Sequence, residues 1–86
     1  MTSFTFTANL SPATAFDGEV KIKADDMTDG SYVTILEEKN DGEYEVAVGQ
    51  SGPLQISFPM TSALFALKGN YKIRRSSDSI SVGYEA

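Results

Sequence analysis

Apolar and polar residues alternate with a period of two along most of the chain, a pattern that places successive side chains on opposite faces of a β-strand. Phe4, Phe6 and Ala8, for example, alternate with Thr5 and Thr7. No window has the i, i+3, i+4, i+7 apolar spacing of a long amphipathic helix. The alternation predicts strands at residues 4–8, 20–24, 32–38, 43–48, 54–58, 71–74 and 80–84.

Turn-forming residues separate these strands at intervals typical of antiparallel structure. The segment 39–43 predicts a hairpin, and residues 76–78 are expected to link the last two strands as another. Residues 61–67 are too apolar for a free loop, which leaves a short helical turn or a bent strand. Turns are expected at Asp17-Gly18, Asp29-Gly30, Asn40-Asp41-Gly42, Ser51-Gly52-Pro53 and Gly69-Asn70.

These elements together predict an all-β fold, an antiparallel β-sandwich or small barrel of about seven short strands. The length of 86 residues suits one domain, 1–86, in which residues 1–16 form an N-terminal strand or arm. Such an arm pairs with its own sheet or exchanges with a neighbouring copy. The expected core consists of Val20, Ile22, Val33, Ile35, Tyr44, Val46, Ile56, Phe58, Ile73 and Val82.

The composition excludes several kinds of chemistry, because the chain contains no Cys, His or Trp. Disulfides, zinc sites with Cys or His ligands and Ser-His-Asp triads are therefore ruled out. The net charge of -5, from 7 basic and 12 acidic residues, argues against nucleic-acid binding as the main role. No apolar run is long enough to span a membrane, and Met1 opens no signal peptide, so we expect neither membrane insertion nor secretion.

The charge is also unevenly distributed along the chain. Three basic and ten acidic residues precede Pro53, whereas four basic and two acidic residues lie from Pro53 onwards. This split suggests association between an acidic and a basic surface, either on two copies of the chain or on a complementary partner.

Candidate catalytic groups are restricted to carboxylates, with Lys and Tyr in support. Glu37, Glu38, Glu43 and Glu45 lie on two strands of one predicted hairpin, where a glycosidase-like carboxylate pair is formally possible. Such pairs normally line a deep cleft, which short-looped β structure of this size rarely builds. We therefore expect a solvated acidic face, and a protein that is not an enzyme.

An acidic turn and a basic strand are the other two candidates for binding chemistry. Asp25, Asp26 and Asp29 precede Gly30 and suit a hard cation such as calcium, but they lack the regular spacing of an EF-hand loop. We expect a turn with no ion, and no cofactor. Lys72, Arg74 and Arg75 beside Tyr71 form one basic strand, which is a weak footprint for nucleic acid in an acidic chain.

Two parts of the chain resemble small β-sandwich structural proteins of tailed bacteriophages, over roughly residues 17–85. Residues 32–38 and 40–46 are similar to the strand, Asp-Gly turn, strand pattern of that family, with Tyr44 near the position where its members usually carry Trp. Residues 69–75, followed by a short turn and the strand 80–84, resemble the closing hairpin of the same proteins.

This resemblance implies a non-enzymatic virion component, assembled in the host cytoplasm, that is most naturally a capsid decoration (cement) protein. Its partners would be the major capsid protein or another virion protein, and further copies of itself in a homo-oligomer. The alternatives are a tail or head-tail accessory protein, a small acidic inhibitor of a host nucleic-acid enzyme, and a carbohydrate-binding module using exposed Tyr32 or Tyr71. The expected contact residues are Phe4, Phe6, Leu64, Phe65, Arg74 and Arg75.

Overall fold

The computed structural model describes all residues from Met1 to Ala86 and confirms an all-β fold class. It contains no helix that is long and apolar enough to cross a membrane. Its strands are β1 (Thr2–Ser3), β2 (Thr14–Asp25), β3 (Tyr32–Asn40), β4 (Glu43–Val46), β5 (Val48–Gly49), β6 (Gly52–Pro53), β7 (Gln55–Ser57), β8 (Ser62–Arg75) and β9 (Ser81–Glu85).

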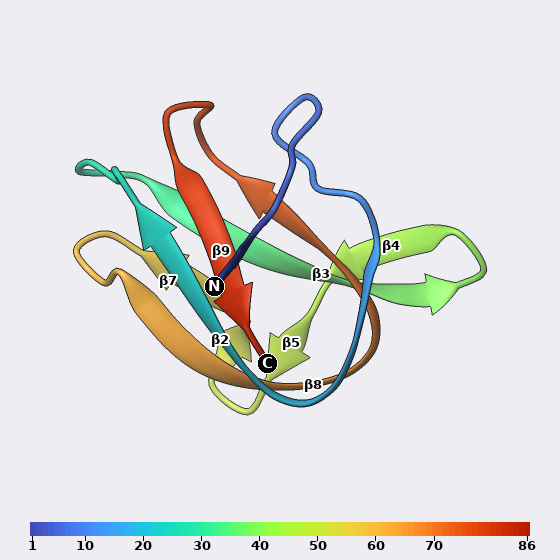
Figure 1. The fold of residues 1–86 in the computed structure, drawn as a ribbon. Helices are drawn as coiled ribbons and strands as arrows, with labels where there is room; N and C mark the ends of the chain where they lie inside the picture. Colours follow the sequence, from blue (N-terminus) through green and yellow to red (C-terminus); the bar gives the residue numbers. More distant parts are fainter.

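β8 belongs to both layers of the fold, because its two parts pair with different strands. Residues 62–71 lie antiparallel to residues 14–23 of β2, and residues 71–75 lie antiparallel to residues 33–37 of β3. One layer therefore has the order β1-β9-β2-β8, and the other continues from β8 to β3, with β4 and β7 on the far edge of β3. Figure 1 shows β8 curving round the lower side of the molecule from one layer to the other.

Two glycines, on pairs of the β2–β8 ladder that are separated by one pair, permit this curvature. Gly18 lies opposite Leu67 and Gly69 lies opposite Phe16, with φ angles of 135° and 120° that residues with a Cβ rarely adopt. A Cβ at either glycine would meet no atom within 4 Å, so the backbone conformation and not the space requires glycine. The turns expected at Asp17-Gly18 and Gly69-Asn70 are wrong, because the two strands stay paired through both positions and bend together.

The apolar segment 61–67 is extended, so of its two alternatives the strand is confirmed and the helical turn is wrong. Ala63, Phe65 and Leu67 pack on the core side, whereas Leu64 points outwards and is 62% exposed. Residues 62–67 pair with β2 throughout. Their backbone N–H and C=O groups therefore form hydrogen bonds across the ladder and do not need the internal bonds of a helical turn.

The N-terminal strand is shorter and begins earlier than the predicted 4–8. Only β1 forms a ladder with β9, and Phe4 adds one bond from its N–H to the Val82 carbonyl at 2.9 Å. Ala8 and Asn9 have φ angles of 51° and 63°, which turn the chain away from β9. β1 itself ends at Ser3, before this turn, and the left-handed turn prevents the predicted strand from continuing through Ala8.

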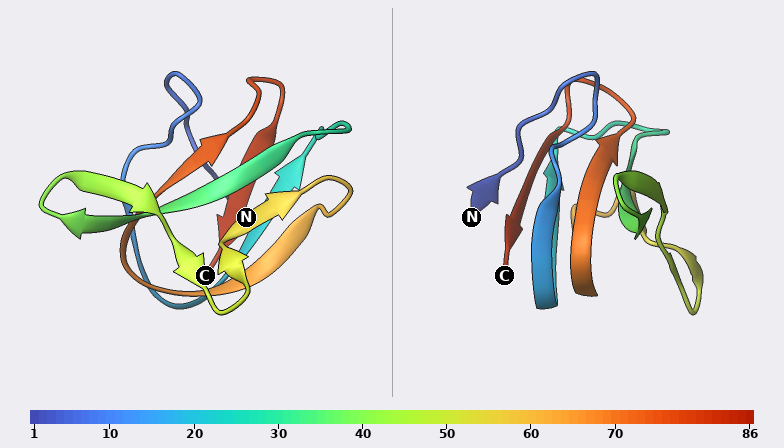
Figure 2. Two further views of the ribbon diagram at one scale, coloured as in Figure 1. Left: turned by 180° about the vertical axis from the view of Figure 1, so that it is seen from behind. Right: turned by 90° about the vertical axis from the view of Figure 1, so that its right-hand side faces the viewer.

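Beyond this turn the chain pairs with the last part of β8. The Arg75 N–H donates to the Asn9 carbonyl at 3.0 Å, and the Ser11 N–H donates to the Ile73 carbonyl at 2.9 Å. The buried Ser11 hydroxyl accepts a further bond from the Ile73 N–H at 2.8 Å. The N-terminal arm, defined here as residues 1–11, thus joins β9 in one layer to β8 in the other and pairs within its own molecule (Figure 2).

The hairpin predicted at 39–43 is confirmed, because β3 and β4 pair up to Asn40 and Glu43. The hairpin predicted at 76–78 is wrong. These residues do connect the last two strands, but β9 pairs with β1 and β2 rather than with β8. The connection therefore crosses between the layers.

The core fills the space between the two layers. It comprises Phe16, Val20, Ile22, Ala24, Val33, Ile35, Ala47, Ile56, Leu67, Tyr71, Ile73, Ile80 and Val82. Three residues expected there lie elsewhere. Tyr44 and Val46 share the outer face of their sheet with Leu36, and Phe58, in the β7–β8 connection, is 43% exposed.

The predicted strand 43–48 is interrupted at Ala47, and its inward face is the opposite of the predicted one. Ala47 turns inwards, and its N–H donates to the Ile35 carbonyl at 2.8 Å. The next residue, Val48, is consequently 67% exposed in the small β5–β6 ribbon instead of extending an inward row with Tyr44.

Replacing Ile73 by Ala should lower the free energy of unfolding by about 3 kcal/mol, because the side chain is fully buried and its loss leaves a cavity. That is a large part of a total of roughly 4–13 kcal/mol for a chain of this length. Leu64→Ala on the same strand is the control, with an expected loss below about 0.5 kcal/mol. Urea unfolding measures both, and equal losses would contradict this assignment of inward and outward faces.

Replacing Gly69 by Ala should lower the free energy of unfolding by about 1–3 kcal/mol, because the φ angle of 120° is strained for a residue with a Cβ. Lys68→Ala, one residue earlier and exposed, is the matched control and should change little. Thermal unfolding of both variants provides the comparison. An unchanged Gly69→Ala protein would show that β8 bends without the glycine.

Candidate binding site at the N-terminal arm

A row of aromatic rings attaches the N-terminal arm to the core. The ring centroids of Phe6 and Phe4 are 6.4 Å apart, and those of Phe4 and Tyr84 are 4.7 Å apart. The row continues from Tyr84 to Phe16 at 5.1 Å and from Phe16 to Tyr71 at 6.2 Å. These spacings fall in the range of favourable aromatic pairs. Side-chain packing therefore holds the arm against β9 where the backbone ladder is only two residues long.

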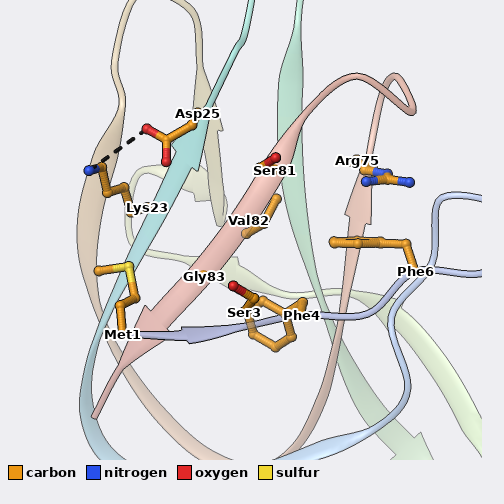
Figure 3. Close-up of a pocket in the computed structure, with 10 residues that line it drawn as sticks. All are labelled: Met1, Ser3, Phe4, Phe6, Lys23, Asp25, Arg75, Ser81, Val82 and Gly83. Carbon is orange, nitrogen blue, oxygen red and sulfur yellow. Dashed lines mark ion pairs between the residues drawn. The ribbon is translucent and has the colours of Figure 1, made fainter.

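Arg75 fixes the other end of the arm. Its Nε donates to Asn9 Oδ1 at 3.0 Å, and its Nη1 donates to the Ile80 carbonyl at 2.8 Å. The guanidinium carbon lies 4.2 Å from the centroid of the Phe6 ring, a cation–π distance. Figure 3 shows the guanidinium lying flat over that ring. Arg75 is half-buried, and both of its hydrogen-bond acceptors are uncharged.

A hollow of about 400 Å³ opens between the arm, β9 and the end of β2. Its volume falls in the lower part of the range typical of small-molecule sites. Ser3, Ser81 and Gly83 line its middle, and Phe6 and Arg75 stand on one side of it (Figure 3). These three small residues leave room above the paired strands β1 and β9.

Gly83 keeps the hollow open beside Met1. A Cβ at this position would lie 3.1 Å from Met1 Cγ and Sδ and 3.1 Å from the Thr2 carbonyl oxygen. Any larger residue would therefore push the Met1 side chain away from the sheet and press on β1.

The charges around the hollow are separated. Lys23 Nζ and Asp25 Oδ1 lie 3.8 Å apart on β2, at the opposite end from Arg75 (Figure 3). These two charges offset each other, which leaves the Arg75 guanidinium as the unbalanced charge among the lining side chains. The hollow thus carries a net positive charge in a chain whose total is -5.

Three of the expected contact residues meet at this hollow, namely Phe4, Phe6 and Arg75. They come from positions about seventy residues apart in the sequence, and only the pairing of the arm with β8 and β9 brings them together.

The other three expected contact residues lie elsewhere. Arg74 is exposed on the opposite face of β8 from Arg75, in register with Thr34. Leu64 is exposed on the outer face of the first part of β8, and Phe65 beside it packs against the core.

Five residues that line the hollow are not predicted from the sequence, namely Met1, Ser3, Lys23, Ser81 and Gly83. Small and polar residues in alternating strands carry no local signal for a site. Asp25, a candidate metal ligand by its sequence, lies at the hollow beside Lys23.

The acidic turn after β2 does not form a cluster. No group of three or more carboxylates lies close enough to share a metal ion, so Asp25, Asp26 and Asp29 do not converge on one point. Asp26 has a φ angle of 65°, which turns the chain at the end of β2.

The carboxylates of the β3–β4 hairpin are engaged by neighbouring donors. Glu38 accepts from Asn70 Nδ2 at 3.1 Å and from the Gly42 N–H at 3.0 Å. The Asn70 bond, then the Gly42 bond, hold the pKa of Glu38 below its usual 4.5. Lys39 Nζ lies 2.7 Å from Glu37 Oε1, and this bond raises the pKa of Lys39. The hairpin therefore does not present an uninterrupted row of free carboxylates.

Tyr44 and Lys72 form a contact on the same outer face. Lys72 Nζ lies 4.7 Å from the centroid of the Tyr44 ring. Partial burial, and then the nearby charge of Glu38, raise the pKa of the Tyr44 hydroxyl. Tyr44 therefore packs against Lys72 on the outer face of the sheet and not in the core.

A second exposed region is apolar and lies at the end of β7. Tyr32 pairs with Ser57, and the following residues Phe58 and Met60 are 43% and 52% exposed. Tyr32 is itself 43% exposed, as the carbohydrate-binding alternative requires. Tyr71 is wrong for that role, because it is buried.

No family model, no curated protein and no solved structure matches this chain. The candidate site is therefore defined by its geometry, and by the chemistry of the residues that line it.

Replacing Asn70 by Ala should raise the pKa of Glu38 towards 4.5, because the strongest donor to its carboxylate is lost. The lowered pKa contributes stability above pH 4.5, and this contribution is lost as the pH falls through the folded-state value. Asn40→Ala is the control, since that amide contacts Glu43 instead of Glu38. NMR titration of the Glu38 carboxyl carbon measures the pKa, and an unchanged value in Asn70→Ala would contradict the assignment.

Proposed function

We propose that this chain is a structural protein of a tailed-bacteriophage virion, acting as a capsid decoration protein that binds the head surface and neighbouring subunits. Its work is binding rather than turnover. The observation that carries the proposal is the convergence of Phe4, Phe6 and Arg75 on one hollow. This arrangement places apolar surface beside a guanidinium, a combination common at protein interfaces.

Exposed apolar side chains elsewhere support a role in assembly. Tyr32, Phe58 and Met60 project from the end of β7. A protein with more than one such surface can contact several neighbours on a particle, and repeated weak contacts then add up through multivalency. The resemblance in residues 32–46 and 69–84 to phage β-sandwich proteins points to the same role.

The test is quantitative mass spectrometry of purified particles of the virus that encodes the chain. A decoration protein should be present at on the order of hundreds of copies per particle, as expected for the many equivalent positions of a capsid shell. A ring-sized complement of about six or twelve copies would instead support the tail or head-tail accessory role.

Two results would rule out the virion role. One is that the chain is absent from purified particles, and the other is that a tagged copy recovers a single host enzyme from lysate. Together these results would overturn the proposal in favour of the acidic inhibitor. In a separate test, the tagged Phe6→Ser variant should lose particle binding. The matched control, Leu64→Ser on a different surface, should retain it.

A further inference from the structure

We propose that the hollow beside the N-terminal arm is a carboxylate-binding site in which Arg75 recognises an acid group carried on a short apolar body. This inference concerns the same hollow that carries the proposed virion contact and names the chemistry of its ligand. It requires only that an acid group binds there, so its test differs from the counting of copies in virions. It rests on the unused donors of Arg75, on the charges around it and on the apolar surface next to it.

Arg75 keeps donors free after its structural bonds are counted. A guanidinium has five N–H groups, and the structure uses one on Nε and one on Nη1. The remaining Nη1 hydrogen and both Nη2 hydrogens have no partner within the protein. Two neighbouring N–H groups on one planar fork match the two oxygens of a carboxylate.

The charge of Arg75 is not neutralised within the chain. The ion pairs of the structure join Lys23 to Asp25 and Lys39 to Glu37, so no carboxylate lies within 4.0 Å of this guanidinium. Arg75 is nevertheless half-buried, a position in which an anionic partner is worth more than it would be in open water. Although the chain has twelve acidic side chains, none of them forms an ion pair with Arg75, so its charge remains available to an anion from outside the protein.

The surroundings restrict the anion to a small acid with an apolar part. Phe6 supplies apolar surface next to the guanidinium, and Phe4 and Met1 supply more of it further along the hollow. Lys23 and Asp25 at the other end offset each other, so that end offers no net positive charge to a second anionic group (Figure 3). A volume of about 400 Å³ holds a carboxylate on an aromatic or aliphatic group of a few carbons.

A purely structural role for Arg75 accounts for only part of its contacts. The bonds to Asn9 and Ile80 explain why Nε and Nη1 point as they do, and Phe6 covers one face of the group. These contacts also hold the fork rigid, so binding of a carboxylate would cost little side-chain entropy.

The carboxylate has two sources, a free small acid or a glutamate side chain of a partner protein, and two probes separate them. The first is hydrocinnamate, with neutral hydrocinnamide as its control. The second is the peptide Phe-Glu-Phe with both ends blocked, with blocked Phe-Gln-Phe as its control. Tighter binding of hydrocinnamate assigns the site to small acids, and tighter binding of the peptide assigns it to a protein side chain.

The experiment is NMR titration of the full chain, following the amide signals of Ser81, Val82 and Gly83 and the Nε–H signal of Arg75. We expect each acid to bind about tenfold more tightly than its neutral control. Arg75→Met should abolish this preference. Arg74→Met removes the same charge from the neighbouring residue on the opposite face and should leave the preference within about twofold.

The comparison of acid with amide on the unaltered chain needs no variant, so it decides the matter even if Arg75→Met does not fold. Equal binding of acid and amide, or shifts confined to signals outside the hollow, would overturn the proposal. So would a folded Arg75→Met protein that keeps the preference. A preference lost in Arg75→Met and kept in Arg74→Met would support it.

Discussion

The bend of β8 at Gly69, where β2 bends beside it at Gly18, is the constraint on which both layers depend. β8 pairs with β2 before the bend and with β3 after it, so this one strand joins the two layers by hydrogen bonds. The inward row of β8 continues through the bend, from Leu67 through Tyr71 to Ile73, and fills the space between the layers from one end to the other. A straight β8 would leave β3 without its central partner, and the largest apolar residues of β3 would lose their cover.

The N-terminal arm connects β8 and β9 on the side where the bend of β8 separates the two layers. Where β8 turns towards β3, its last residues move away from β9, and the arm bridges the resulting gap by pairing with both strands. Arg75 takes part twice, since its backbone pairs with Asn9 while its guanidinium reaches Asn9 and Ile80. The bridge is incomplete because the arm pairs with β9 only as far as Phe4 and with β8 only from Asn9 onwards. Phe4 and Phe6, at and after the end of the first pairing, line the hollow. The proposed carboxylate site is thus a by-product of closing the fold with an arm that does not pair along its whole length.

Charge in this chain is balanced locally rather than by one large field. Glu38 is held by Asn70 and Gly42, Glu37 by Lys39, and Asp25 by Lys23, so the acidic excess of the first half is partly engaged within each strand pair. Phe4, Phe6 and Arg75 are each predicted from the sequence as contact residues, because Phe4 and Phe6 lie on the N-terminal arm and the adjacent Arg74 and Arg75 point to opposite faces of one strand. Their meeting was not recognisable, and neither were Ser81 and Gly83, since small residues mark a site only when something larger stands on either side of them.

The sequence alone determined the β class, the inward rows at Val20 and Ile22, Val33 and Ile35, and the hairpin at 39–43, because these depend on side-chain period and turn chemistry within a few residues. The tertiary structure decided whether a glycine reverses the chain or bends a paired strand, and which face of each strand is buried. Asp17-Gly18 and Gly69-Asn70 are turns by composition, yet each lies opposite a paired strand that keeps the chain extended, so the same positive φ bends the ladder instead of reversing it. Tyr44 and Val46 share the period of core residues, yet the register of β4 on β3 pairs Val46 with Leu36 and places both residues of β4 on the outer face. Local patterns specify which residues alternate, whereas partners distant in the sequence specify which face is inside, because burial is a property of the assembled layers.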